Sequence, residues 1–393
     1  MKRSLTGMLL LSAAAFAAAP VFGEPAATLS VVPQNERSDV TTMKPMGPHW
    51  VITSGQNGGM LVLDTDSGKM QGEVVNYGGN LAIDPNGKYF YTSETFYAHR
   101  NRGARDDVVT IWDTSTLKVV KEIKIPGRMI VGGHIQNFQV SADGSHAFVY
   151  NMMPSSSVIV TDIGKQEVEQ TVELPGCAGI YVNAVGGFSS LCSDGSLASV
   201  NFVAGKASIV RSKPFFNATT DPIYDNSVSD PKTGKATFLT YSGLIYQASL
   251  GATTTPEKPW SIQEGAEMKK AEAAPLAVAW YPGGSQPFAV HYADNRIYVL
   301  MHLGEYWTHV SAGTEVWILD GATHKLIRRA ELPDKKIGSS IQVTQGDNPK
   351  VLISEGGRGE PGSTGKLLVL DGTTLKKDRE IEHAGGGNLF IKS

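Results

Sequence analysis

Asp84-Pro-Asn-Gly87, then the apolar run from Lys88 to Ser93, then a loop and Ile111-Trp-Asp113, form the clearest copy of the pattern that decides the fold. Each copy has a tight turn, an apolar strand, a loop and a second apolar strand that stops at Asp or a close substitute. The copies end at Asp64, Asp113, Asp162, Asn201, Ser249, Asp320 and Asp371. Successive copies are 39 to 71 residues apart, and a strand-rich repeat of about 40–50 residues is typical of a β-propeller. We therefore expect an all-β, seven-bladed β-propeller.

The remaining strands of each blade are also readable. A fairly polar segment such as Val119–Ile123 follows each closing Asp, as suits an outermost strand with one wet face. Segments of small and apolar residues, such as Asn80–Ile83, precede the tight turns and suit the inner wall around the axis. The chain ends on a similar piece, Gly386–Ile391. We expect it to supply the inner strand of the first blade, so that N- and C-terminal strands close the ring and remove exposed sheet edges.

The composition and the first residues indicate where the protein works. The 393 residues carry a net charge of -3, with no basic stripe that would suggest nucleic acid. Residues 1–23 have the pattern of a cleaved signal peptide, with Lys2 and Arg3 before a short apolar stretch. That stretch is too short for a permanent membrane anchor. We predict an exported protein of the periplasm with no membrane association, in which residues 24–393 form a single propeller domain.

The two cysteines, Cys177 and Cys192, flank two segments expected to be adjacent strands of blade four. An oxidising compartment favours a disulfide between them. Such a bridge would close a loop of about 15 residues and contribute about 3 kcal/mol in the chain-entropy model. The other interpretation is a pair of free thiols that bind a metal, although no further soft ligands lie nearby in the sequence.

Several catalytic motifs are missing from the sequence. It has no Cys-x-x-Cys-His for covalent haem, no Gly-x-Gly-x-x-Gly that opens a helix, and no His-Glu-x-x-His or Gly-x-Ser-x-Gly. The nine histidines are scattered, and residues such as His134 and His302 fit structural roles better than ligand roles. We predict neither a catalytic residue nor a metal site in this chain.

Two connections are too long for simple hairpins. Residues 94–107 contain three arginines and two aromatics, and residues 303–314 also contain aromatics. Both lie between the second and third strands of their blades, so we expect them to project from the same face. Loops on a rigid scaffold often bind partners, and Arg with Tyr or Trp is typical of interface hot spots; well-packed surface loops are the alternative. A third insertion, residues 256–274, favours a short helix within 264–272 over one end of blade six.

At these loops the chain resembles the heavy subunit of the quinoprotein amine dehydrogenases, which are tryptophan tryptophylquinone enzymes. Four segments carry the resemblance across essentially all of the mature chain. They are Arg102-Gly-Ala-Arg-Asp-Asp-Val-Val-Thr-Ile-Trp-Asp113, the stretch from Cys177 to Leu197, Trp280-Tyr-Pro-Gly-Gly284 with His291 and Arg296-Ile-Tyr298, and Met301-His302 through His309 to Asp320. Together they are specific, whereas any one alone would be weak.

The resemblance implies the non-catalytic heavy subunit of a periplasmic heterotetramer of two heavy and two light subunits. The quinone and the catalytic base then belong to the light subunit, and this chain binds no cofactor. The implied reaction converts a small primary amine and water to an aldehyde and ammonia. Electrons pass to an amicyanin- or azurin-like blue copper protein or to cytochrome c. The family places an aromatic residue of the first blade beside the substrate channel, whereas the matching residues 53–59 contain none.

The loop residues expected to contact the light subunit or line the channel are Phe96, Tyr97, Arg100, Arg102, Arg105, Tyr306, Trp307 and His309. Arg102 and Arg105 could instead pair with Asp106 or Asp107. Two other functions remain open from the sequence. One is a stand-alone periplasmic YVTN-like propeller that binds a ligand or partner without redox activity. The other is a lactonase-like metal hydrolase.

Overall fold

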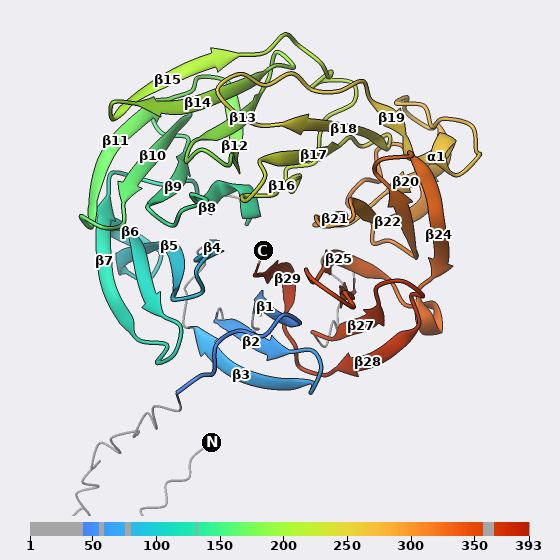
Figure 1. Ribbon diagram of the computed structural model, residues 1–393, viewed down its shortest axis with the longest axis horizontal. Helices are drawn as coiled ribbons and strands as arrows, with labels where there is room; N and C mark the ends of the chain where they lie inside the picture. The colour runs from blue at the N-terminus through green and yellow to red at the C-terminus, as the bar shows by residue number, and fades with distance from the viewer. Residues whose placement is uncertain (1–41, 55–58, 75–79, 131–132, 357–364, 393) are drawn as a thin grey trace, which may run out of the picture. The chain divides into compact units, whose positions relative to one another are not determined.

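The computed structural model describes residues 42–54, 59–74, 80–130, 133–356 and 365–392. These residues form seven antiparallel sheets arranged as blades around a central axis (Figure 1). The predicted all-β, seven-bladed propeller is therefore confirmed. The predicted signal peptide, residues 1–23, lies outside the described residues.

The first three blades, read from the axis outward, follow the predicted strand order. Blade one is β29 (Gly386–Ile391), β1 (Trp50–Ser54), β2 (Met60–Asp64) and β3 (Lys69–Val74); blade two is β4 (Asn80–Ile83), β5 (Tyr89–His99), β6 (Arg102–Asp113) and β7 (Val119–Ile125); blade three is β8 (Phe138–Val140), β9 (His146–Asn151), β10 (Ser157–Asp162) and β11 (Glu167–Glu173). A short 3-10 helix, η1 (Ile135–Asn137), leads into β8.

The other four blades repeat the arrangement, and the inner strand of blade six is divided in two. Blade four is β12 (Cys177–Val182), β13 (Phe188–Cys192), β14 (Leu197–Val203) and β15 (Lys206–Arg211), and blade five is β16 (Val228–Ser229), β17 (Lys235–Leu239), β18 (Leu244–Ser249) and β19 (Trp260–Ser261). Blade six is β20 (Val278–Pro282) and β21 (Phe288–His291), then β22 (Arg296–Glu305), β23 (Glu315–Asp320) and β24 (Lys325–Glu331). Blade seven is β25 (Gly338–Val343), β26 (Lys350–Glu355), β27 (Leu367–Asp371) and β28 (Lys377–Ile381). A second 3-10 helix, η2 (Pro333–Lys335), precedes β25. The inner strand of blade six is thus split into β20 and β21, which both pair with β22.

The tight turns show why the closing Asp recurs. Asp113 Oδ1 accepts hydrogen bonds from the backbone N–H groups of Ser115 and Thr116 at 3.0 and 2.8 Å. Asp371 Oδ1 repeats this with the N–H of Thr374 at 2.7 Å. These side-chain contacts form an Asx turn, which ends the third strand and starts the fourth. The bonds to Ser115 and Thr116 also hold the pKa of Asp113 below its ordinary value.

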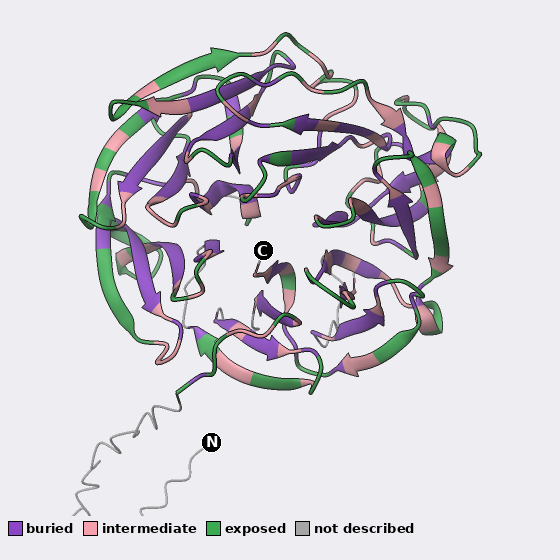
Figure 2. Cartoon of the chain, viewed as in Figure 1, coloured by how far each residue is buried: buried purple, intermediate pink, exposed green. Residues whose placement is uncertain are grey.

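Side chains from neighbouring blades form the core. Val149, Phe138 and Ile159 of blade three pack with Val109 of blade two in one cluster, and each is at most 1% exposed. The outer strands are mainly exposed, as Figure 2 shows along the rim of the disc. The polar fourth strands therefore match the wet outer face that their sequences predict.

The insertion between blades five and six differs from the prediction. The insertion does contain a short helix, α1 (Ile262–Gly265), but only Glu264 and Gly265 of the stretch 264–272 belong to it, and the chain beyond it is irregular. Ser261 caps the helix by accepting a hydrogen bond from the N–H of Glu264. Glu267 has a φ of 58°, which is incompatible with a continuing α-helix. The helix-forming composition of this stretch is not supported by a buried apolar face, and composition alone gives little helix stability.

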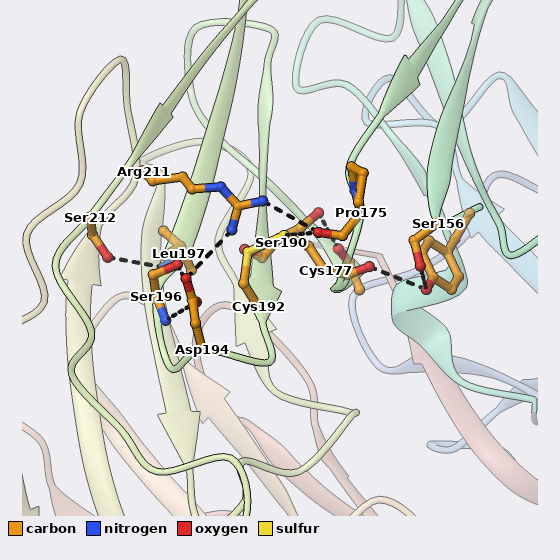
Figure 3. The surroundings of a disulfide bond; sticks show 12 residues. Ser156, Pro175, Cys177, Ser190, Cys192, Asp194, Ser196, Leu197, Arg211 and Ser212 are labelled. Atoms are coloured by element: carbon orange, nitrogen blue, oxygen red, sulfur yellow. Dashed lines mark hydrogen bonds and ion pairs between the residues drawn. A yellow bond between two sulfur atoms is a disulfide. The ribbon is translucent and has the colours of Figure 1, made fainter.

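Cys177 and Cys192 form the predicted disulfide and lie directly opposite each other on β12 and β13. Figure 3 shows Arg211 of β15 beside this bridge, where it donates to the Pro175 carbonyl at 3.4 Å and lies 3.8 Å from Asp194. Both cysteines are at most 3% exposed. The bridge therefore fixes the start of blade four to its second strand.

Replacing both cysteines with serine should lower the free energy of unfolding by about 3 kcal/mol, because the unfolded chain would regain the freedom of the closed loop. Urea unfolding of the purified protein measures the change. The wild-type protein with its disulfide reduced serves as the control and should be destabilised to a similar extent. Equal unfolding midpoints for wild type and variant would contradict the assignment.

Candidate functional site

The described connections between second and third strands lie on one face of the disc, because the strands of every blade alternate in direction. We call it the hairpin face; it carries residues 100–101, 152–156, 193–196, 240–243 and 306–314. The opposite face, which we call the turn face, carries the tight Asp turns. The two long connections therefore project from the same face, as predicted. Ser54 and Gly59 bring the ends of the first-blade loop to this face, whereas residues 55–58 lie outside the described part of the chain.

The predicted loop 94–107 is a β-hairpin. β5 and β6 stay paired as far as His99↔Arg102, with a turn at Arg100 and Asn101. Gly103 has a φ of 93°, a conformation that favours glycine and fits the end of this turn. The prediction of a loop was wrong because the hairpin extends beyond the core, where buried apolar residues no longer mark a strand.

Polar contacts hold the base of the hairpin. Asp107 accepts hydrogen bonds from Thr95 Oγ1 at 2.6 Å and from Arg105 Nε at 3.0 Å. Arg105 Nη2 also donates to the carbonyl of Arg128 at 2.8 Å, and Arg128 Nε donates to Thr95 Oγ1 at 2.8 Å. Burial of Arg128 lowers the pKa of its guanidinium. Arg105 therefore pairs within the chain, in agreement with the alternative considered from the sequence.

The tip of the hairpin is available for contact. Phe96 is 39% exposed, Tyr97 is half-buried, and Arg100 and Arg102 are exposed. Neither of these two arginine side chains has an ion pair or hydrogen bond among the described residues, so the alternative pairing of Arg102 is not seen. An exposed phenyl ring next to unpaired guanidinium groups is the composition typical of a protein interface.

An aromatic cluster from blades five and six forms the second part of the hairpin face. His309 stacks on Tyr241 with ring centroids 3.9 Å apart, and Trp307, which is 47% exposed, lies 6.5 Å from both rings. Tyr224 donates to the carbonyls of Pro282 and His309. Sequence reasoning missed Tyr241 and Tyr224. The sequence signal for Tyr241 is an aromatic residue in the Tyr241-Ser-Gly243 turn. The prediction considered only the long connections, and this one is short.

Tyr306 does not lie where the prediction placed it. The side chain is fully buried, and its hydroxyl donates to the Thr220 carbonyl at 2.6 Å and to Asp221 Oδ1 at 3.2 Å. Burial and the nearby Asp221 carboxylate raise its pKa. Tyr306 therefore packs against Trp307 from the protein interior, with ring centroids 4.7 Å apart, and is not itself part of an exposed contact surface.

The Trp280-Tyr-Pro-Gly-Gly284 segment explains how the loop of blade six reaches inward. A Cβ on Gly283 would lie 2.4 Å from both His302 Nδ1 and the Ser311 carbonyl. Gly284, with a φ of 111°, lies against the carbonyl of Ser339 in blade seven. The two glycines let the backbone break between β20 and β21 and let the 306–314 loop pack over the break.

Exposed apolar side chains are unevenly divided between the two faces. The hairpin face exposes Phe96, Ile130, Met152, Met153, Leu276, Leu303, Trp307 and Val310, and connections of the turn face expose Val185 and Val203. The outer strands expose a further set along the rim, namely Met70, Val119, Val120, Ile209, Val210 and Ile327. Concentrations of this kind mark protein interaction sites. Aromatic residues and Met are enriched at interfaces, so the hairpin face is the candidate docking surface.

No group of three or more His, Cys, Asp or Glu side chains among the described residues is placed to hold a metal ion. Within the same residues, no helix is long and apolar enough to cross a membrane.

Comparisons with known proteins agree on a family. Residues 47–387 match the family described as methylamine dehydrogenase heavy chain. The methylamine dehydrogenase heavy chain of Methylobacillus flagellatus is 31% identical over 339 residues, covering 85% of this chain and 78% of the relative. That of Methylophilus methylotrophus is 29% identical over 373 residues, covering 93% and 85%. The β-propeller domain of Cps50 (Swd1) from Myceliophteria thermophila superposes with a TM-score of 0.56 at 11% identity over 84% of this chain and 95% of that one, which supports the fold alone.

The aromatic cluster predicts a pH dependence of stability. Burial lowers the pKa of His302 and of His309, and the Nδ1 atom of each is buried without a hydrogen-bond partner among the described residues. The unfolded chain therefore binds protons that the folded chain does not, and stability falls as the pH drops below the ordinary imidazole value of 6.5. Replacing His309 with Phe keeps the stack on Tyr241 and removes one of these groups. The loss of stability between about pH 7 and pH 5 should shrink, by less than about 1 kcal/mol because partial exposure screens the charge.

Urea unfolding at both pH values measures this difference. His99→Phe is the matched control, because His99 is exposed at the hairpin tip. This substitution should leave the pH dependence of stability unchanged. An equal effect of the two substitutions would contradict the role of burial.

Proposed function

Since this chain belongs to the methylamine dehydrogenase heavy chain family, and is thereby a subunit of an amine dehydrogenase, we propose that it is the non-catalytic heavy subunit of a periplasmic heterotetramer. Two such chains hold two light subunits, and each light subunit carries a tryptophan tryptophylquinone cofactor. The family match over residues 47–387 supports the proposal because it includes six complete blades and most of blade one. A stand-alone YVTN-like binding protein has no comparable support.

The light subunit docks on the hairpin face in this proposal. The observation that carries it is the concentration of exposed Phe96, Met153 and Trp307 on that face, beside the unpaired Arg100 and Arg102. Large apolar side chains would provide the buried centre of the interface. The arginines would meet carboxylates or carbonyl oxygens of the partner. Arg105 and Tyr306 act indirectly, because they hold the hairpin and Trp307 in place.

The chemistry follows from the division between subunits. The quinone on the light subunit accepts electrons as a primary amine and water become an aldehyde and ammonia, and a blue copper protein or cytochrome c then takes the electrons. This chain would position the partner, line part of the substrate channel and exclude water from it. The sequence from Thr53 to Gly59, which matches the family's aromatic-bearing channel segment, contains no aromatic residue, so this proposal does not name the size of the amine.

Export is part of the same proposal. The signal-like residues 1–23 and the Cys177–Cys192 disulfide both fit an oxidising compartment such as the periplasm.

Substitution of the exposed aromatics should weaken assembly. The full chain is co-expressed with a light subunit of the methylamine dehydrogenase type, and a tag on the heavy chain is used for purification. Phe96→Asp and Trp307→Asp should each reduce affinity for the light subunit by about 30-fold, because each places a charge in a desolvated apolar contact. Retention of the light subunit and of its quinone absorbance measures the loss.

Val203→Asp makes the same change on the turn face, where Val203 is 66% exposed. This control should assemble as wild type does. If Val203→Asp disrupted the complex and the two aromatic variants did not, the docking face would be the opposite one. If no small quinone-bearing partner co-purified with the wild-type chain, the proposed function would be wrong.

A further inference from the structure

A two-stranded ribbon of blade six projects beyond the rest of its sheet. β22 pairs with β23 only as far as Met301↔Glu315, whereas β20 follows β22 to Val278↔Glu305. In an antiparallel pair, opposite residues share one face, and so do alternate residues along each strand. Val278, Leu303 and Glu305 therefore lie on the same face of this ribbon. Val278 is 67% exposed and Leu303 is 60% exposed, so this face presents apolar surface to solvent.

The chain between α1 and β20 adds to this exposed surface, since Leu276 is 76% exposed and Met268 is 37% exposed. Met268, Val278 and Leu303 line one cavity of about 520 Å³. Figure 1 shows that this part of the chain protrudes beyond the ring of outer strands. We call Met268, Leu276, Val278 and Leu303 the blade-six patch. It is an apolar surface at the edge of the disc, where a second molecule can reach it.

The backbone of Leu276 has an unfavourable conformation. Its φ is 63°, in the left-handed region that residues other than glycine rarely adopt. The same residue has the most exposed large apolar side chain of the described residues. Neither property stabilises an isolated chain. Strain of this kind at an exposed position indicates a function, and burial of the side chain against a partner would offset its cost.

Two charges of opposite sign flank the blade-six patch. Lys270 lines the same cavity as Val278, and Glu305 lies opposite Val278 on the ribbon. Neither charged side chain has an ion pair or hydrogen bond among the described residues. The neighbouring Lys269, by contrast, pairs with Glu272 at 2.8 Å. An apolar centre with one free charge of each sign is complementary to a second copy of itself, because a twofold axis brings each Lys270 to the Glu305 of the other copy.

From these features we propose that the blade-six patch joins two copies of this chain across a twofold axis. The patches of the two copies form the buried centre of the contact, and Lys270 and Glu305 form reciprocal ion pairs at its rim. The inference deepens the proposed function and rests on it, because it identifies the surface that brings two heavy chains together in the heterotetramer. The contact itself needs only this chain.

The light subunit is the other candidate for this surface. A surface that meets a different protein needs complementarity only to that protein, whereas an isologous contact requires one patch to carry both members of each pair. The blade-six patch meets this requirement, since Lys270 and Glu305 have opposite charges and both lack a partner among the described residues. We therefore assign the patch to a second copy.

Sedimentation velocity of the purified full chain measures the contact. The wild-type chain should form a dimer in the absence of a light subunit. Val278→Asp and Leu303→Asp should each raise the dissociation constant of this dimer by about 30-fold, because each places a charge in a desolvated apolar contact. Val203→Asp is the matched control, since Val203 is 66% exposed but lies on the turn face. It should dimerise as wild type does.

Charge exchange tests whether the partner is a second copy. Lys270→Glu and Glu305→Lys should each weaken the dimer by about tenfold, because each brings like charges together across the axis. The double variant should dimerise as wild type does, since each pair is rebuilt with its signs reversed. Contact with a different protein would not be restored in this way.

Leu276→Gly separates the contact from folding. Glycine adopts a φ of 63° without strain, so the urea midpoint of the dilute chain should not fall. The dimer should nevertheless weaken by about tenfold, because the exposed leucine side chain is lost. A lower urea midpoint with an unchanged dimer would contradict the role of Leu276.

The inference is overturned if the wild-type chain alone is monomeric, if the two Asp variants of the patch dimerise as Val203→Asp does, or if the double charge variant is not restored. A monomeric chain whose patch variants lose the light subunit would show that the patch binds the light subunit instead. Failure of the light subunit to co-purify with wild type would refute the proposed function and leave the mass of the chain alone unaffected, so the two failures can be told apart.

Discussion

The pairing of β29 with β1 is the contact on which the rest of the disc depends. It joins residues from opposite ends of the chain, with Val51 opposite Ile391 and Ile52 opposite Phe390. Each blade packs mainly on its two neighbours, as in other repeat architectures. Without this pairing, blade one would lose its inner strand and the sheet edge of β1 would be exposed.

Side-chain amides reinforce the closure at the axis. Gln286, in the break of blade six, accepts a hydrogen bond from the N–H of Leu389 at 2.9 Å and donates to its carbonyl at 3.3 Å. Gln342 of blade seven donates to the same carbonyl at 3.4 Å. The closing strand is thus bound by its own blade and by two others. The residues that split the inner strand of blade six therefore stabilise the ring as well as the loop above it.

Apart from the closing β29–β1 pair, which the C-terminal segment indicated by its likeness to the other inner strands, the sequence predicted features that depend on neighbours along the chain and missed those that depend on distant residues. The closing Asp residues were readable because each, like Asp113, bonds to backbone groups within three positions. The burial of Tyr306 was not readable, because its partner Thr220 is 86 residues away. The β5–β6 hairpin escaped for the same reason, since Arg128, which holds its base, lies 33 residues beyond Thr95. A cavity between blades three, four and five could not be predicted from the sequence, because its walls come from three blades.

The two faces differ because their connections are under different constraints. On the turn face, most connections between third and fourth strands are short Asx turns that need Asp or a substitute at a fixed place, and blade five differs with a longer connection, residues 250–259. On the hairpin face, the connections range from the two-residue turn at 100–101 to the long loop at 306–314. Blades with a common core can therefore carry different surfaces there. Loops on a rigid scaffold often carry binding residues, and Trp307 and Arg102, from different blades, lie on the same side of the disc.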